Sequence, residues 1–411
     1  MIWKQRYSVL SILFGAYLLC YLDRMVMASA IPFIALDFHL SATAMGVVLS
    51  AFFAGYALMQ IPGGMLADRL GPRLVLVGSI VWWSLFTALT GLANGFGTLL
   101  MVRVVFGLGE GPFPAAAGKT LANWFPSREL GRASGLQQAS TYIGAAIAPL
   151  IVTTLIRVVG WRSIFSFLFL PGAVLAFLVW HYVGSKPTHA RFVTSQAVDD
   201  ARFGKPKGDL RGSLQTPAVR WCATSLFLSN VVSWGLMNWL PTYLLRAKGY
   251  SVDEMGILAS LTNFAGAAGF VLGGYVCDRY FTGRLRIPLA LGLFSSAVFT
   301  YLAAVLPGRG EAVACLVLVF ITLNISFTAI FTLPLVIVPK HAVGGAFGIV
   351  NTAGQLAGVV APTLVGSLLD LNHGNFRTVL FVMVGFTLAA IYPALRIHQS
   401  SDSHELSAET T

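Results

Sequence analysis

Charged side chains are scarce in this sequence. Only 10% of the 411 residues are Asp, Glu, Lys or Arg, whereas 56% are hydrophobic. A soluble globular domain carries about 25% charged residues. The shortage excludes an ordinary soluble domain, because too few charges are present to cover a solvated surface.

Cysteine and histidine are also too few and too scattered for a metal centre. The four cysteines (Cys20, Cys222, Cys277 and Cys315) show no Cys-x-x-Cys spacing, and the seven histidines lie at loops, helix ends or the tail. A zinc site or a nucleophile–base pair would need such residues to cluster. We therefore predict no metal, no cofactor and no enzymatic activity, and we interpret the cysteines as small buried apolar residues. A polytopic membrane enzyme or receptor is the rival class that these gaps disfavour.

Apolar runs of membrane length fill most of the chain. A bilayer core about 30 Å thick needs about 20 residues per helix, and backbone groups in lipid must pair internally, as in a helix or a closed barrel. Barrel strands have only about 10 alternating residues, so continuous runs predict helices. We expect an all-α membrane protein with twelve transmembrane helices, near residues 8–34, 42–66, 73–94, 98–122, 132–158, 163–184, 217–245, 254–278, 285–306, 310–338, 343–369 and 375–395.

The basic residues are distributed unevenly between the two sides of the predicted membrane. Of the 27 lysines and arginines, eighteen fall at the termini and the loops on the same side, and six fall in the opposite loops. The other three (Arg24, Arg103 and Lys119) lie within predicted helices. The excess of positive charge predicts that both termini are cytoplasmic. The net charge of +11 then reflects topology in a lipid bilayer. Nucleic-acid binding is not predicted, because the loops offer no face on which basic and aromatic residues alternate.

The chain repeats itself at half its length. GGMLADRLGPR at 63–73 returns as GGYVCDRYFTGR at 273–284, and FPSRELGRASG at 125–135 returns as VPKHAVGGAFG at 338–348. In each half the first motif follows the second predicted helix, on the same side of the membrane. Such parallel repeats predict two pseudo-symmetric six-helix bundles related by an axis along the membrane normal.

A polar stretch separates the two halves. We predict an N-terminal bundle at 1–184, a cytoplasmic linker at 185–215, a C-terminal bundle at 216–398 and a disordered cytoplasmic tail at 399–411. Polar composition without a long apolar run is typical of linkers and tails.

The loop motif resembles a signature of the major facilitator superfamily. GGMLADRLGPR has Gly64, Asp68, Arg69, Gly71 and Arg73 in the family's positions, and Asp278 and Arg279 repeat its core. The resemblance covers nearly the whole chain and implies two bundles that rock about a central site by alternating access. We interpret Gly64 as a close helix contact. We expect Asp68 to accept hydrogen bonds at a helix end and to pair with an arginine, latching the two bundles on the cytoplasmic face.

Four charged residues lie near the middle of predicted transmembrane helices, where charge is rare. CYLDRMVMAS at 20–29 places Asp23 and Arg24 near the middle of the first predicted helix, and MVRVVFGLGEGPFPAA at 101–116 places Arg103 and Glu110 in the fourth. Each costs about 2.5–3.5 kcal/mol at a helix centre on insertion scales. Arg103 and Glu110 are seven residues apart, so they lie on the same face. Glycines and prolines nearby predict a helix that packs closely and bends.

These charges have a structural and a functional interpretation. They sum to zero, and in the structural interpretation they form two salt bridges that only hold the bundle together, although buried pairs are weak evidence for stability. In the functional interpretation, Asp23 and Glu110 take up protons while Arg24 or Arg103 holds an anionic substrate. We favour Arg103 as the carboxylate anchor and pair Arg24 with Asp23 or Glu110. Protonating a carboxylate frees its arginine for the substrate, which couples the two events.

The Tyr-Leu-Asp-Arg of the first helix and the Arg-x6-Glu of the fourth narrow the resemblance. They are similar to the anion:cation symporter family, whose members carry sugar acids, aromatic acids and other organic anions, commonly with protons. The resemblance implies that Asp23 and Glu110 act in proton coupling. The partners expected are a small organic anion, protons and the bilayer, and the protein is expected to be a monomer.

Further polar residues lie at membrane depth and are candidates for substrate contact. For each of them a hydrogen bond between helices is an equal alternative. The resemblance favours Gln138 over Gln137, and in the second half the candidates are neutral. The full set is Tyr21, Tyr56, Gln138, Trp234, Asn238, Asn324, Ser326, Asn351 and Gln355.

The function expected is import of a sugar acid or another carboxylate with protons. An organic-anion exchanger or uniporter without proton coupling is a first alternative. A drug–proton antiporter is a second, but Ala148 precedes Pro149 and no glycine pair follows it, so the antiporter pattern of the fifth helix is missing. Arginines in the cavity also disfavour a cationic drug.

Overall fold

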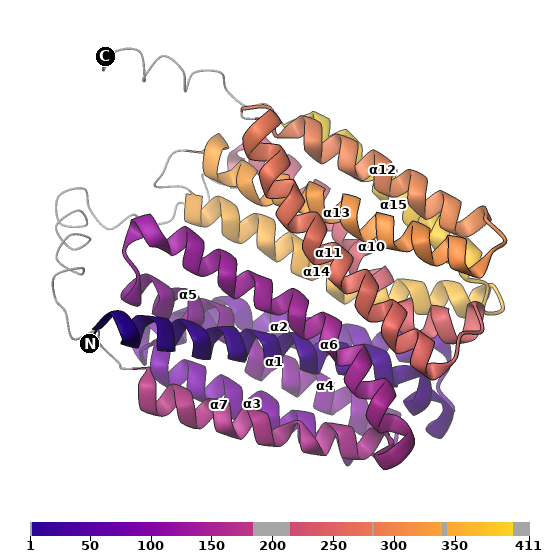
Figure 1. The fold of residues 1–411 in the computed structure, drawn as a ribbon, viewed down its shortest axis with the longest axis horizontal. Helices are drawn as coiled ribbons and strands as arrows, with labels where there is room; N and C mark the ends of the chain where they lie inside the picture. Colours follow the sequence, from indigo (N-terminus) through magenta and orange to yellow (C-terminus); the bar gives the residue numbers. More distant parts are fainter. Residues whose placement is uncertain (1, 184–213, 282, 339–342, 398–411) are drawn as a thin grey trace. The chain divides into compact units, whose positions relative to one another are not determined.

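The computed structural model describes residues 2–183, 214–281, 283–338 and 343–397. Between residues 2 and 183 lie seven helices (Figure 1): α1 (Ile2–Asp37), α2 (Ala42–Arg69), α3 (Pro72–Gly91), α4 (Phe96–Glu110), α5 (Phe113–Trp124), α6 (Ser127–Phe167) and α7 (Phe169–Tyr182). The second half of the chain contains α10 (Pro217–Thr242) with the π-helical turn η1 (Tyr243–Ala247), α11 (Val252–Tyr280), α12 (Arg286–Val305), α13 (Arg309–Ile337), α14 (Val343–Leu371) and α15 (Phe376–Leu395).

Ten stretches of the described residues are long and apolar enough to cross a membrane. One of them, Arg132–Tyr182, has 51 residues and would be about 76 Å long as a single straight helix, more than twice the bilayer core. It breaks at Gly160, whose φ of 72° leaves the helical region, so it supplies two spans. The 26-residue helix α10 brings the number of spans to the predicted twelve.

Prolines and glycines explain where several helices begin, end and break. Ser41 caps α2 by accepting a hydrogen bond from the Ala44 nitrogen at 3.1 Å, as serine commonly does before a first turn. Gly71, with a φ of 84°, makes the turn between α2 and α3, and Pro72 opens α3. The place predicted to bend in the fourth span is a short interruption between α4 and α5 at Gly111 and Pro112, and both residues keep right-handed helical backbone angles.

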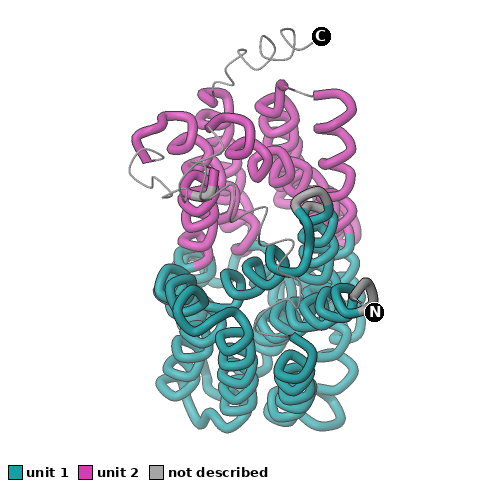
Figure 2. The backbone as a smooth tube through the Cα atoms, turned by 90° about the vertical axis from the view of Figure 1, so that its left-hand side faces the viewer, with its two compact units in different colours: residues 1–204, 235–264, 359–375 teal, residues 205–234, 265–358, 376–411 magenta. Residues whose placement is uncertain are grey.

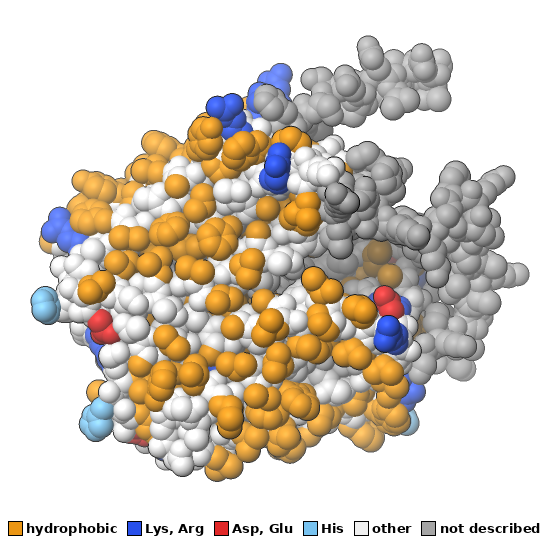
Figure 3. Space-filling view, turned by 180° about the vertical axis from the view of Figure 1, so that it is seen from behind, with side chains coloured by type: hydrophobic (Ala, Val, Ile, Leu, Met, Phe, Trp, Pro, Cys, Tyr) orange, Lys and Arg blue, Asp and Glu red, His pale blue; other side chains and the backbone are white. Residues whose placement is uncertain are grey.

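The surface of the helices is strongly apolar. Hydrophobic side chains spread over much of the face in Figure 3, with basic side chains near its margins. Large apolar residues such as Ile61, Val158 and Val271 are exposed. Contiguous exposed apolar surface of this kind is expected where a protein meets lipid rather than water.

The described helices form two compact units (Figure 2). Unit 1 contains α1 to α7 together with residues 235–264 and 359–375, which are parts of α10, η1, α11 and α14. Unit 2 contains the remaining parts of α10, α11 and α14 with α12, α13 and α15. Almost all of the predicted linker at 185–215, and the whole predicted tail at 399–411, lie outside the described residues.

Candidate functional site

The four charges singled out in the sequence are buried inside unit 1. Asp23 and Arg24 come from α1, and Arg103 and Glu110 come from α4, of which Glu110 is the last residue. Their exposed fractions are 1%, 4%, 2% and 0% respectively. We call these four residues the charge cluster. Burying them is costly unless they pair with one another or with a ligand.

Glycines bring α2 and α4 together beside the cluster. A methyl group at Gly107 of α4 would overlap the backbone of α2 at Phe52, and one at Gly55 of α2 would overlap α4 at Val104. Small residues allow helix backbones to approach this closely. The approach places the rings of Phe52 and Tyr56 against the charges that come from α1 and α4.

Arg24 pairs with Glu110. Its Nε donates a hydrogen bond to Glu110 Oε1 at 2.6 Å, and Nη2 donates to the same oxygen. Three rings surround the guanidinium, with the centroids of Tyr21, Phe52 and Tyr56 at 4.7, 4.7 and 4.6 Å from its central carbon. Charge-assisted hydrogen bonds and cation–π contacts both stabilise a buried arginine. The structure thus selects Glu110, of the two carboxylates considered, as the partner of Arg24.

Asp23 and Arg103 make fewer polar contacts than Arg24 and Glu110 do. Thr87 of α3 donates a hydrogen bond to Asp23 Oδ2 at 3.4 Å. Arg103 lies over the ring of Phe106, with its central carbon 4.5 Å from the centroid, and makes no ion pair with a described residue. Electrostatic attraction still links Arg103 to Asp23 and Glu110. Arg103 is therefore the cluster cation that has no committed carboxylate.

Each member of the cluster also has one buried polar atom that lacks a hydrogen-bond partner among the described residues. These atoms are Asp23 Oδ1, Arg24 Nη1, Arg103 Nε and Glu110 Oε2. Unsatisfied buried groups are rare in folded proteins, so these four atoms leave the cluster with room for a further polar partner. The arrangement can exchange partners without first breaking every existing contact.

Sequence reasoning missed two residues that contact the cluster. Cys20, which was interpreted as a plain apolar residue, donates from Sγ to Glu110 Oε1 at 3.0 Å. Thr87 had not been singled out at all. The signal for Cys20 was present, because it lies four residues before Arg24 and so shares its helix face. No spacing rule links Thr87 to Asp23, since the two come from different helices.

The remaining predicted contact residues have mixed surroundings. Tyr21 and Tyr56 lie at the cluster, whereas Gln138 is exposed and its neighbour Gln137 is buried. In α13, Asn324 donates to the Phe320 carbonyl at 2.8 Å and Ser326 donates to the Leu289 carbonyl at 3.1 Å. Ser326 thus makes the hydrogen bond between helices that the sequence left as an alternative, whereas this bond of Asn324 lies within α13. The others are buried on α10 (Trp234 and Asn238) or half-buried on α14 (Asn351 and Gln355).

The loop motif makes contacts within the first half. Lys119 of α5 pairs with Asp68 at 2.8 Å and also donates to the Ala67 carbonyl at 3.0 Å, so the ion-pair partner of Asp68 is a lysine rather than the expected arginine. Arg73 donates to the Trp180 carbonyl and lies over its ring, 4.4 Å from the centroid.

The glycine of closest approach in the motif differs from the one predicted. A methyl group at Gly64 would sit 3.9 Å from Ala115, an ordinary contact, whereas one at Gly63 would come 2.7 Å from Pro112 Cβ. Gly63 is therefore the tight position. Arg69, Asp278 and Arg279 are exposed, and Gly71 serves the turn already described.

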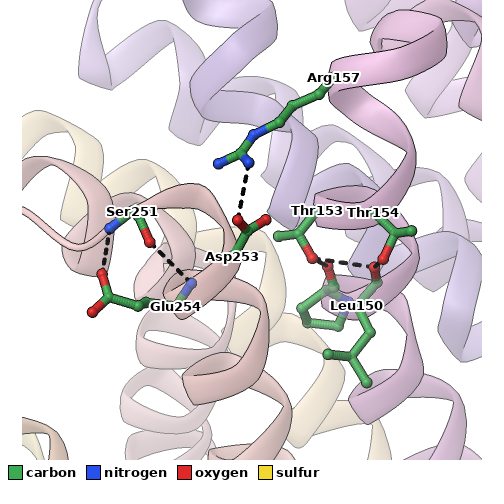
Figure 4. Close-up of polar contacts among 8 residues, drawn as sticks. Leu150, Thr153, Thr154, Arg157, Ser251, Asp253 and Glu254 are labelled. Atoms are coloured by element: carbon green, nitrogen blue, oxygen red, sulfur yellow. Dashed lines mark hydrogen bonds and ion pairs between the residues drawn. The ribbon is translucent and has the colours of Figure 1, made fainter.

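Within unit 1, α6 is tied to the start of α11 (Figure 4). Arg157 Nη1 contacts Asp253 Oδ2 at 2.9 Å, and a methyl group at Gly256 would overlap Thr153. Ser251 and Glu254 cap the first turn of α11 reciprocally, at 2.8 and 3.3 Å. Both residues of the ion pair are more than half exposed, so the charges themselves contribute little.

A second set of contacts joins α2 to the end of α14, also within unit 1. Asp370 accepts hydrogen bonds from the Ala42 and Thr43 nitrogens, at 3.0 and 2.7 Å. Thr363 donates to Ser50 Oγ from both its nitrogen, at 3.2 Å, and its hydroxyl, at 2.9 Å. We call these five residues the α2–α14 seam. A carboxylate at a helix N-terminus satisfies free backbone donors and opposes the positive end of the helix dipole.

Comparisons with known proteins agree with this architecture. The family model described as Major Facilitator Superfamily matches residues 13–362. A hexuronate transporter from Bacillus subtilis is 30% identical over 401 residues, covering 96% of this chain and 94% of the relative. A probable sulfoacetate transporter from Cupriavidus necator is 33% identical over 387 residues, covering 89% and 88%.

Solved structures show the same fold. A D-xylose–proton symporter aligns with a TM-score of 0.75 at 16% identity, covering 96% of this chain and 98% of that one. A bacterial homologue of the human lysosomal transporter Spinster, inward-facing and occupied, aligns with a TM-score of 0.75 at 20% identity, covering 98% and 97%. The chain belongs to the Major Facilitator Superfamily of membrane transporters, in the group that includes the sugar-acid and organic-anion transporters.

Proposed function

We propose that the protein imports a small organic anion, a sugar acid or another carboxylate, together with protons by alternating access. The observation that carries the proposal is the buried Arg24–Glu110 pair, beside Arg103, which makes no ion pair with a described residue. Relatives named as hexuronate, L-galactonate and sulfoacetate transporters support an anionic substrate. The basic loops support cytoplasmic termini in a bacterial inner membrane.

The proposed coupling follows from competition for Arg24. While Glu110 is ionised, two guanidinium donors of Arg24 are committed to its Oε1. Protonation removes the negative charge, weakens that pair and frees the fork of Arg24 for a substrate carboxylate. The substrate then supplies the charge that Glu110 lost, so the buried cluster stays neutral.

Arg103 and Asp23 complete the proposed cycle. Arg103 anchors the incoming anion first, because it can do so without breaking an ion pair within the described residues. Asp23 then carries a second proton. The rings around both arginines exclude water and strengthen these electrostatic interactions.

The test is proton uptake into vesicles that contain the pure protein and an internal pH dye. Hexuronates, galactonate, sulfoacetate, dicarboxylates and aromatic acids are added in turn. We expect internal acidification with one class of acid, and its loss in Glu110→Gln. Glu311→Gln is the matched control, because Glu311 lies exposed in the first turn of α13, and it should behave like the unaltered protein.

Three outcomes would contradict the proposal in whole or in part. Entry or exchange of labelled anions without acidification would make the protein a uniporter or an exchanger and the cluster a structural network. Movement of cationic drugs alone would make it an antiporter. Full proton-driven uptake by Glu110→Gln would remove Glu110 from the coupling path.

A further inference from the structure

We propose that Cys20 is a positioning residue that holds one oxygen of Glu110 and leaves the other to take the proton. The inference rests on the proposed proton coupling through Glu110. Cys20 Sγ lies 3.0 Å from Glu110 Oε1 as a donor, and both residues are fully buried, with 1% and 0% exposed. Cys20 touches no substrate in this scheme and acts only through the carboxyl group.

The two oxygens of Glu110 are unequal. Oε1 accepts from three donors, the Cys20 thiol, Arg24 Nε and Arg24 Nη2. Oε2 has no partner among the described residues. A carboxylate oxygen has about two lone-pair sites, so Oε1 is saturated and the free lone pairs are those of Oε2. The geometry therefore assigns the proton to Oε2.

The thiol has a separate role after protonation. When Arg24 turns to the substrate anion, Oε1 loses two of its three donors. Cys20 remains, because its donor is neutral and does not follow the charge. The carboxyl group then keeps its rotamer and Oε2 keeps its direction, so that the proton can leave from the same atom that accepted it.

A thiol suits this role better than a hydroxyl. Its S–H is a weak donor, so it orients Oε1 without strongly favouring the ionised form. A hydroxyl in the same place would donate more strongly and make protonation harder. Removing the donor altogether would make the ionised form less stable and protonation easier.

Other ionisable groups that face Glu110 are the same in every variant at position 20. Their electrostatic effect on Glu110 therefore does not contribute to the difference between the variants. They are Asp23, Arg24 and Tyr21 from α1, Tyr56 from α2 and Arg103 from α4. Only the donor at position 20 differs between the variants proposed here.

The experiment is an infrared titration of the full-length protein in liposomes, without added substrate. It follows the C=O stretch of the protonated carboxyl group that disappears in Glu110→Gln. We expect the pH midpoint of that band to rise by about 0.4 unit in Cys20→Ala, the low end of the range for one neutral hydrogen bond, because a thiol is a weak donor. In Cys20→Ser it should fall. Cys222→Ala is the matched control, because Cys222 is an equally buried thiol in the apolar core of unit 2, and its midpoint should not move.

The outcomes separate this inference from the proposed function. Equal midpoints in Cys20→Ala, Cys20→Ser and the unaltered protein would overturn the role of Cys20 and leave Glu110 as the proton carrier. Absence of any band that disappears in Glu110→Gln would overturn the proposed function itself. If Cys20→Ala does not fold, the opposite shift expected of Cys20→Ser still decides the matter.

Discussion

Gly107 is the position where one added methyl group should disturb the charge cluster most. It lies on α4 against the backbone of α2, and a Cβ there would overlap the Phe52 carbonyl oxygen and come 2.8 Å from the Tyr56 nitrogen. These same two residues supply two of the three rings around Arg24. Gly107→Ala therefore perturbs the site without altering any charged side chain.

The expected size follows from the overlap. Carbon–oxygen contacts are ordinarily 3.3 Å or longer, so α2 and α4 must separate locally by about 1 Å. Overpacking of this kind costs about 1–3 kcal/mol, offset by about 1 kcal/mol that alanine gains over glycine in a helix. We expect a stability loss of about 0–2 kcal/mol. Transport should fall by about 100-fold, because a 1 Å misplacement of binding groups has that effect.

Two measurements check this prediction. Initial uptake in proteoliposomes is measured with whichever acid the unaltered protein transports, and thermal unfolding is followed in detergent. Gly118→Ala on α5 is the matched control, because its Cβ would meet nothing within 4 Å, and it should keep full transport. Wild-type transport and stability in Gly107→Ala would refute the idea that the glycine contact positions the cluster.

Two further variants test the pair and the seam. Arg24→Lys keeps the charge but loses the fork that reaches Glu110 Oε1, so substrate affinity should fall by about 10-fold or more on the scale of a charged hydrogen bond; unchanged affinity in a binding titration would contradict the role of the fork. Asp370→Asn weakens the contact with the α2 N-terminus by about 0.5–1 kcal/mol. A Ser50→Cys substitution places a reporter thiol at a buried position of the α2–α14 seam. Maleimide labelling of this thiol should become about 2–5-fold faster when Asp370→Asn is added. The native cysteines are buried and supply the unreactive background, and equal labelling rates would exclude a role for Asp370 in closing the seam.

Much of the architecture could be predicted because lipid acts on each segment separately. Span length, the absence of charge, the break at Gly160 and the interruption after Glu110 are local properties of the chain. The exceptional cost of charge at membrane depth drew attention to Asp23, Arg24, Arg103 and Glu110 for the same reason. The structure places all four in one buried cluster.

Residue-level choices in the loop motif and the fifth span were harder to make from sequence. Gly63 rather than Gly64 is the close contact, and Asp68 pairs with Lys119 from a helix 51 residues away. Gln137 rather than Gln138 is the buried member of its pair. The two members of each adjacent pair, Gly63 and Gly64 or Gln137 and Gln138, differ only in which side of the helix they occupy, and a motif does not record that. The partner of Asp68 depends on how α2 and α5 pack.

By itself the sequence determined that this protein crosses the membrane many times, repeats at half its length and carries four charges at depth, because hydropathy, periodicity and the cost of buried charge act along the chain. Only the tertiary structure decided that Arg24 binds Glu110 rather than Asp23, that Cys20 is the third donor to the same oxygen, and that Arg103 has no committed carboxylate among the described residues. Those choices depend on how α1, α2 and α4 are rotated and how closely their glycines let them approach, and contacts 86 and 90 residues apart in sequence follow from no local spacing.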